Sequence, residues 1–230
     1  MIRLIGVVVP AHNEQDLLPS CLASLRRAAQ ELPGIPARLV VVADACRDRT
    51  AAVARRGGAA VVTTGARSVG AARAAGVREV LRGAGHLDPA DIWLATTDAD
   101  TRVPACWLRG QVRHADQGWD AVAGTVRVVD WTGYPPNVRS LFRERYGAGT
   151  GPHSHVHGAN LGFRASAYLR AGGFPDVPTA EDHALVAALT ATGSRVCRTR
   201  ALTVATSARR DGRAPHGFSG YLAELDTASA

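Results

Sequence analysis

The sequence predicts an α/β protein with a mostly parallel sheet flanked by helices, and two features of the chain support this fold class. Short runs of β-branched and other apolar residues alternate with segments of helical character, four times within the first 117 residues. Several of these runs end in an acidic turn, as at Asp44 and Asp98. Repeated strand–helix units of this kind form parallel sheets with right-handed crossovers.

The expected strands are apolar runs of strand length that are bounded by glycine, proline or acidic residues. In chain order they are residues 3–9, 38–43, 59–63, 91–97, 120–130 and 195–204. Gly124 interrupts the fifth of these runs.

The expected helices begin at a capping residue or carry apolar residues at helical spacing. Asn13 is expected to cap the first helix, which ends at the prolines near residue 33. Ser68 is expected to cap an alanine-rich helix, and Thr179 a helix in the second half of the chain. The helix after Ser68 is expected over residues 69–82 and the helix after Thr179 over residues 180–192. Further helices are expected from residue 48 or 50 to 56 and over residues 104–115 and 166–171. Residues 131–151 are expected to be irregular or partly helical, and the last stretch weakly helical.

We expect a single domain over residues 1–230, which is long enough to bury a full core. Residues 1–117 form its nucleotide-binding half, and residues 118–206 complete the sheet and shape a second pocket. Residues 207–230 are expected to be a basic C-terminal tail.

The charge of the chain limits its chemistry and its partners. The net charge is +7 and all 27 basic residues are arginine, so Schiff-base and P-loop lysines are excluded. The arginines are scattered and few aromatic residues accompany them, so we expect no nucleic-acid partner. Phosphorylated small molecules or an anionic membrane surface fit this charge better.

The chain shows no signal for membrane insertion or for a cysteine framework. No apolar run approaches the roughly 20 residues of a spanning helix, and the N-terminus reads as a strand. The four cysteines are far apart and form no CxxC pair, which argues against a zinc site or disulfides. We therefore expect a cytoplasmic protein, with peripheral membrane contact left open and the oligomeric state unknown.

Asp98 and Asp100 follow the fourth expected strand, one residue apart. In an extended segment both side chains would point to the same side. At the end of a strand in an open α/β sheet they would face the crevice where such folds bind ligands. Two hard oxygen donors there suit Mg²⁺ or Mn²⁺ bridging to phosphate oxygens. The alternative is a helix cap beside a solvated carboxylate.

A series of short motifs follows in order along the chain. It comprises VPAHNE at residues 9–14, VVADACRDRT at 41–50, GAARAAG at 70–76, DAD at 98–100, GANLGFR at 158–164, GGF at 172–174 and ED at 181–182. Together, over residues 4 to 204, they resemble a family 2 glycosyltransferase with the GT-A (nucleotide-diphospho-sugar transferase) fold, a Rossmann-like sheet.

The resemblance implies a UDP- or GDP-linked sugar as donor, and Mn²⁺ or Mg²⁺ as cofactor. It assigns Asp100 to the metal that bridges the diphosphate. The residues that it assigns to the nucleotide sugar are Pro10, Ala11, Asn13, Glu14, Asp44, Arg73, Asp98 and Ala99. A carboxylate such as Asp44 at a strand end accepts the N–H of a uracil-like base, although a turn or helix cap is the alternative. The alternative for Arg73 is a solvated helix face.

The resemblance also implies an acceptor-binding half, in which Asp182 is the general base. An inverting transfer needs a carboxylate that removes the proton of the acceptor hydroxyl during in-line attack. Gly158, Asn160 and Glu181 are the expected acceptor-binding residues, and the acceptor itself is unidentified. A retaining outcome stays open. The alternative for Asp182 is an acidic residue in the first turn of a helix that only interacts favourably with the helix dipole.

Two further clusters have open roles. His153, His155 and His157 alternate, so on a strand they share one side as a metal site, an acceptor loop or solvated side chains. The arginines at 209, 210 and 213 near His216 suggest either a tail folding over a diphosphate or a disordered basic segment.

Three other functions fit the sequence less well. The DADT string at residues 98–101 resembles the nucleophile motif of haloacid-dehalogenase-like phosphatases, but it follows the fourth strand and lysine is absent. A nucleotidyltransferase would need a glycine-rich basic loop where VPAHNE stands. A non-catalytic sugar-nucleotide-binding protein would not need Asp98, Asp100 and Asp182 together.

Overall fold

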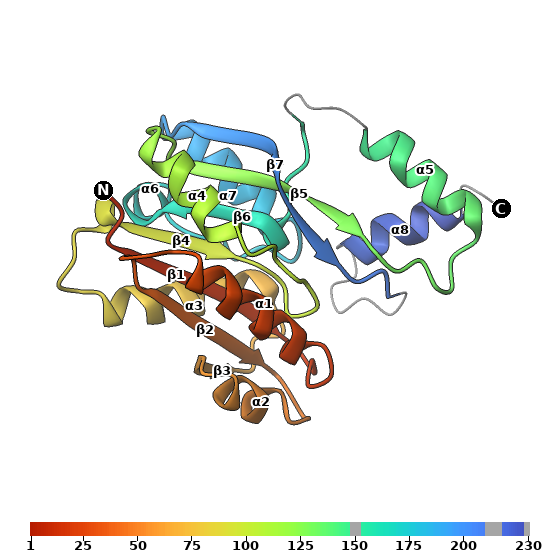
Figure 1. Ribbon diagram of the computed structural model, residues 1–230, viewed down its shortest axis with the longest axis horizontal. Coiled ribbons are helices and arrows are strands. Elements are labelled where there is room, and N and C mark those ends of the chain that lie inside the picture. Colours follow the sequence, from red (N-terminus) through yellow and green to blue (C-terminus); the bar gives the residue numbers. More distant parts are fainter. Residues whose placement is uncertain (148–152, 210–217, 228–230) are drawn as a thin grey trace.

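The computed structural model describes residues 1–147, 153–209 and 218–227, and within them a seven-stranded sheet runs through the molecule (Figure 1). Its strand order is β3-β2-β1-β4-β6-β5-β7. β6 is antiparallel to both of its neighbours, and all the other pairs are parallel. The strands are β1 (Leu4–Ala11), β2 (Ala37–Asp44), β3 (Ala60–Thr64), β4 (Ile92–Thr96), β5 (Ala121–Val128), β6 (Leu161–Arg164) and β7 (Val196–Thr206). The expected α/β class with a mostly parallel sheet is confirmed.

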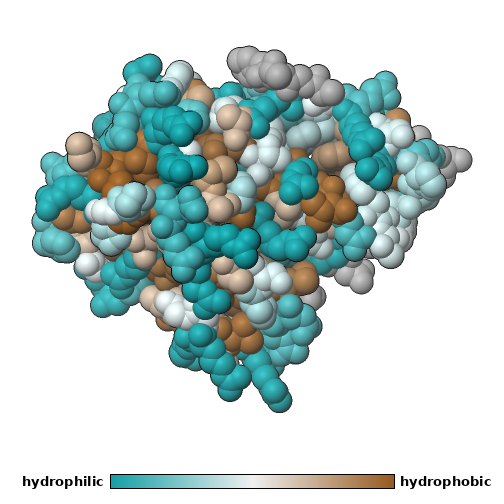
Figure 2. All heavy atoms as spheres, viewed as in Figure 1, coloured by the Kyte–Doolittle hydropathy of each residue, from teal (hydrophilic) through white to brown (hydrophobic). Residues whose placement is uncertain are grey.

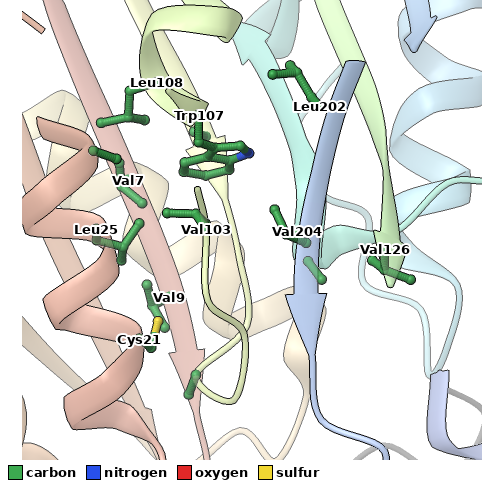
Figure 3. Close-up of a cluster of buried hydrophobic side chains, with 14 of the residues drawn as sticks. Val7, Val9, Cys21, Leu25, Val103, Trp107, Leu108, Val126, Leu202 and Val204 are labelled. Atoms are coloured by element: carbon green, nitrogen blue, oxygen red, sulfur yellow. The ribbon is translucent and has the colours of Figure 1, made fainter. Parts of the chain in front are cut away.

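Helices cover both faces of this sheet because its central strands are apolar on both sides. In β1, Val7 and Val9 face one core cluster, whereas Val8 faces the other. The first cluster lies under α1 (Leu18–Gln30), α2 (Thr50–Arg56) and α4 (Trp107–Asp116). Figure 3 shows part of it, with Leu25, Trp107 and Leu108 approaching the strands. The second lies under α3 (Val69–Gly83), α6 (Ala165–Arg170) and α7 (Glu181–Ala191).

Two helices extend the molecule beyond the ends of β5 and β7, namely α5 (Pro136–Tyr146) and α8 (Phe218–Thr227) (Figure 1). They pack through aromatic rings, with Phe142 and Phe218 in an edge-to-face contact at 5.9 Å between centroids. Leu222 and Leu225 of α8 are fully buried. The weakly helical C-terminal stretch is thus a packed helix over residues 218–227, and the segment after residue 131 is partly helical as expected.

Short helical turns at Pro89–Asp91 and Gly158–Asn160 lead into β4 and β6. The visible face of the molecule mixes hydrophilic and hydrophobic residues, and it is mainly hydrophilic at the lower edge (Figure 2). None of the helices within the described ranges is long and apolar enough to cross a membrane.

The structure confirms one predicted helix cap and contradicts two. Ser68 caps α3, since its hydroxyl accepts the N–H of Ala71 at 3.2 Å. Asn13 does not cap α1: it has a φ of 54° and its side chain accepts the N–H of Arg47. Thr179 does not cap α7, because Ala180 precedes that helix in the left-handed region at φ 60°. For Asn13, the contact with the loop after β2 outweighs the local capping preference.

The order of the strands creates a switch point beside β1. The chain moves from β1 to β2 and β3 on one side and then returns to β4 on the other. Ala11 of β1 is in register with Ala43 of β2, so the loops after β1, β2 and β4 leave the sheet at the same edge. Open α/β sheets bind ligands in the crevice at such a point.

Candidate active site

A cavity of about 740 Å³ opens at this edge of the sheet. Both halves of the chain line it. Every residue that the sequence assigned to the site contributes to its lining except Asn160: these are Pro10, Ala11, Asn13, Glu14, Asp44, Arg73, Asp98, Ala99, Asp100, Gly158, Glu181 and Asp182. Residues distant in sequence thus share one cavity.

Asp98 and Asp100 do not lie in an extended segment, so the expected period-2 geometry is wrong. They belong to a turn after β4, which the N–H of Thr101 closes by donating to the carbonyl oxygen of Asp98 at 3.0 Å. Both still line the cavity. Burial, with the nearby charge of Asp98, raises the pKa of Asp100 to about 6. Burial and the charge of Asp98 disfavour the ionised form of Asp100, and a bound cation would stabilise that form.

Arg73 lies in the interior between the two halves of the site. Its guanidinium donates to Asp98 at 2.7 Å and forms a short ion pair with Glu181 of α7. Only 4% of the Arg73 side chain is exposed, which rules out a solvated helix face. Burial alone would lower the pKa of Arg73, but the charges of Asp98 and Glu181 raise it. Arg73 therefore ties the turn after β4 to the start of α7.

Asp182 is held by two backbone groups at the start of α7. One carboxylate oxygen accepts the N–H of Gly158 at 2.7 Å, and the other accepts the N–H of His183 at 2.8 Å. Gly158 lies against the Arg73 guanidinium so closely that a β-carbon there would collide with it. Arg73, Gly158 and Asp182 thus form one continuous network.

The loops after β1 and β2 form the polar end of the cavity. The two carboxylate oxygens of Asp44 accept the N–H groups of Arg67 and Ser68, each at 3.0 Å. His12 contacts the carbonyl oxygen of Asp44 through Nδ1 at 2.7 Å. Asp44 therefore anchors the loop before α3 while it lines the cavity, and a carboxylate oxygen keeps the capacity for a further donor.

Arg209 reaches the same region from the segment after β7. Its guanidinium forms a bidentate pair with Glu14, at 2.9 and 2.5 Å, and lies 3.3 Å from an oxygen of Asp100. Glu14 is deeply buried. The other basic residues of the expected tail cluster, Arg210, Arg213 and His216, lie outside the described residues.

The three alternating histidines share one side, as expected. The ring of His155 stacks on Tyr146, with His153 and His157 on either side of it. Burial lowers the pKa of His157 to about 4, so the ring is neutral at pH 7. Within the described ranges no group of three or more histidine, cysteine or acidic side chains is placed to hold a metal. Of these three histidines, His157 lines the cavity, and His153 and His155 lie behind it in the ring stack.

An apolar wall forms a further part of the cavity. It is lined by Val126, Val156, Phe218 and Tyr221, with His157 beside them. Sequence reasoning missed these residues because they come from a strand, a loop and a distant helix. The one feature of the sequence that could have indicated them is the pair of aromatic residues Phe218 and Tyr221 in the C-terminal stretch.

Asn160 lies beneath the cavity and does not line it. Its side chain accepts the indole N–H of Trp107 at 2.8 Å and donates to the carbonyl oxygens of Thr125 and Leu202. All of these groups are buried, so the amide holds α4, β5 and β7 together. This motif residue therefore supports the fold from within the core.

Comparisons with known proteins show what the chain is similar to. The model of the family "Glycosyl transferase family 2" matches residues 6–170. An undecaprenyl-phosphate 4-deoxy-4-formamido-L-arabinose transferase of Pseudomonas aeruginosa is 32% identical over 168 residues, covering 70% of this chain and 46% of the relative. The chain thus spans about half the length of that relative.

Solved structures share the fold at low sequence identity. Staphylococcus aureus TarS 1–349 in complex with UDP-GlcNAc has a TM-score of 0.68 and 16% identity, covering 95% of this chain and 62% of that one. The mannosyltransferase PcManGT of Pyrobaculum calidifontis, in complex with GDP-Man and Mn²⁺, has a TM-score of 0.62 and 23% identity, covering 91% and 58%.

Proposed function

Because the chain belongs to glycosyl transferase family 2, we propose that it transfers a sugar from a nucleoside-diphosphate sugar to an acceptor hydroxyl. The observation that carries this proposal is the meeting of Asp98, Asp100 and Asp182 in one cavity of about 740 Å³. A cavity of this size is typical of small-molecule sites. The phosphatase and non-catalytic alternatives are not favoured by the family match.

The nucleotide is proposed to lie over the loops after β1 and β2. Asp44 would accept an N–H of the base, and Asp98 would contact the ribose or the sugar hydroxyls. The likeness to proteins solved with UDP-GlcNAc and with GDP-Man makes both nucleotides reasonable candidates. Pro10, Ala11 and Asn13 line this end of the cavity.

The donor chemistry of Asp100 fits Mn²⁺ or Mg²⁺. The buried carboxylate lies beside Asp98 in the cavity, and such cations commonly take one or two protein carboxylates together with phosphate oxygens and water. Asp100 would hold the ion. When bound, the ion would neutralise charge that develops on the leaving nucleoside diphosphate. The likeness to a protein solved with Mn²⁺ supports this choice of cofactor.

Asp182 is proposed to act as the general base of an inverting transfer. Its carboxylate is oriented by the N–H groups of Gly158 and His183, and lone pairs remain to take the acceptor proton. As the acceptor oxygen bonds to the anomeric carbon, the bond from that carbon to the diphosphate oxygen breaks and the proton passes to Asp182. Glu181 and Gly158 would shape the acceptor side.

The acceptor is proposed to lie along the apolar wall formed by Val126, Val156, Phe218 and Tyr221. The P. aeruginosa relative is named for undecaprenyl phosphate, so a lipid-linked acceptor is the first class to test. We propose a cytoplasmic protein that reaches such an acceptor by peripheral contact with the membrane.

The test is calorimetric titration of the purified protein with UDP and with GDP, each with and without Mn²⁺. We expect metal-dependent binding of one nucleotide, and its loss in Asp100→Asn. Asp116→Asn, an exposed position on α4 outside the cavity, is the matched control and should bind as the wild type does. Failure of both nucleotides to bind, with or without Mn²⁺, would overturn the proposed function.

A further inference from the structure

Arg209 puts a positive charge where the proposed function requires a metal ion. Its guanidinium lies 3.3 Å from Asp100 and forms two hydrogen bonds with Glu14. Only 4% of the Glu14 side chain and 13% of the Asp100 side chain are exposed. Two acidic side chains with so little access to water need a nearby cation. In this structure Arg209 supplies it.

A metal ion and this guanidinium cannot both keep these positions at low cost. A divalent ion on Asp100 would lie a few ångströms from the guanidinium, and like charges at that distance repel strongly in a partly buried site. The diphosphate of a donor would bring several negative oxygens into the same cavity. The planar guanidinium is suited to bidentate binding of phosphate oxygens.

The position of Arg209 in the chain makes an exchange feasible. It lies three residues beyond β7, which ends at Thr206, and its side chain is 25% exposed. Its backbone N–H donates to the hydroxyl of Ser207 at 3.2 Å. The side chain, which already lines the cavity, can therefore turn from the two carboxylates to a diphosphate in the same cavity without disturbing the sheet.

We propose that Arg209 is a counter-ion that the metal displaces from Asp100, and that the released guanidinium then binds the donor diphosphate. This inference rests on the proposed function. In the ligand-free protein Arg209 compensates the acidic pair and competes with metal. In the donor complex it contributes to the diphosphate site. The two roles predict opposite effects of one substitution on two binding measurements.

The first measurement is Mn²⁺ binding without nucleotide, followed by the electron paramagnetic resonance signal of the free ion. Arg209→Gln keeps much of the side chain and can still donate to Glu14, and Arg209→Ala removes the group entirely. We expect both variants to bind Mn²⁺ on the order of tenfold more tightly than the wild type, a typical size for coupling between two ligands. Arg47→Ala removes the same charge from an exposed position on the cavity lining, and it should change Mn²⁺ affinity much less.

The second measurement is calorimetric titration with UDP and GDP at saturating Mn²⁺. Here the same Arg209 variants should bind the nucleotide several-fold more weakly than the wild type. Thermal unfolding identifies any variant that fails to fold, and Arg209→Gln then serves in place of Arg209→Ala.

The outcomes separate this inference from the proposed function. If nucleotide binds with Mn²⁺ but the Arg209 variants bind Mn²⁺ alone no more tightly than the wild type, the exchange is wrong and the proposed function stands. If neither metal nor nucleotide binds to any variant, both fail. Tighter Mn²⁺ binding with unchanged nucleotide affinity would refute the transfer of Arg209 to the diphosphate.

Discussion

The backbone N–H of Gly158 donates to the carboxylate of Asp182 at 2.7 Å, which joins the proposed base to the turn that leads into β6. Gly158 in turn lies against the guanidinium of Arg73, whose partners are Asp98 and Glu181. The proposed donor side and the proposed acceptor side of the cavity therefore share one set of polar contacts. A change at Gly158 or Arg73, which contact groups on both sides, should therefore affect both.

Asp182→Asn should remove transferase activity while leaving donor binding intact. The amide keeps the size of the side chain but cannot take a proton, and general base catalysis contributes roughly 10²- to 10⁴-fold in rate. The measurement is the rate of sugar transfer, beside calorimetric nucleotide binding. Asp176→Asn, an exposed position in the loop before α7, is the control and should keep the wild-type rate. An active Asp182→Asn enzyme would exclude Asp182 as the base.

Gly158→Ala should destabilise the protein, because the new methyl group meets the Arg73 guanidinium. Overpacking of this kind costs about 1–3 kcal/mol, and displacement of Arg73 should also weaken nucleotide binding through Asp98. Denaturant unfolding and calorimetry measure the two effects. At Gly85 an added β-carbon meets only a carbonyl oxygen at 3.8 Å, so Gly85→Ala should be close to neutral. Equal stability of the two variants would contradict the tight contact.

Asn160→Ala should act on stability and leave the affinity for nucleotide unchanged. The substitution leaves the indole N–H of Trp107 and two buried carbonyl oxygens without their present partner. One such buried group costs about 1–3 kcal/mol, so we expect a loss of at least about 2 kcal/mol in unfolding free energy. Urea unfolding at 25 °C measures it. Full stability with a raised KM for the acceptor would instead return Asn160 to the acceptor site.

His157 should make the folded state less stable in acid. Burial lowers its pKa to about 4 from the ordinary value of 6.5. Between these values the unfolded chain binds a proton that the folded chain does not, so stability is complete above pH 6.5 and is lost as pH falls toward 4. The loss should approach roughly 3 kcal/mol near pH 4.

Urea unfolding at several pH values, compared between wild type and His157→Gln, measures this contribution. Glutamine can still accept the hydroxyl of Tyr146, which lies 2.9 Å from His157 Nε2. The variant should lose less stability than the wild type over the same pH range. Parallel pH profiles would show that His157 titrates normally in the folded protein.

Local sequence patterns determined most of the elements. The apolar runs and their turn residues placed β1, β2, β4 and β7, and the cap at Ser68 placed the start of α3. These features depend on burial on both faces of the sheet and on hydrogen bonds between residues close in sequence. Both leave patterns that can be recognised in one sequence. The resemblance to a glycosyltransferase family also identified residues of the cavity: all but one of the site residues that it implied line the cavity.

Only the tertiary structure decided what several of those residues touch. For Arg73 the sequence left a solvated helix face open beside a nucleotide contact, but α7 covers the residue and brings Glu181 onto its guanidinium. Asn160 reads as an acceptor ligand, but three separate elements surround it and bind its carbonyl oxygen and its amide nitrogen. Arg209 lies 195 residues from Glu14 and still neutralises it. Sequence periodicity records which face of an element is buried, whereas partners so distant along the chain are chosen by how the elements pack.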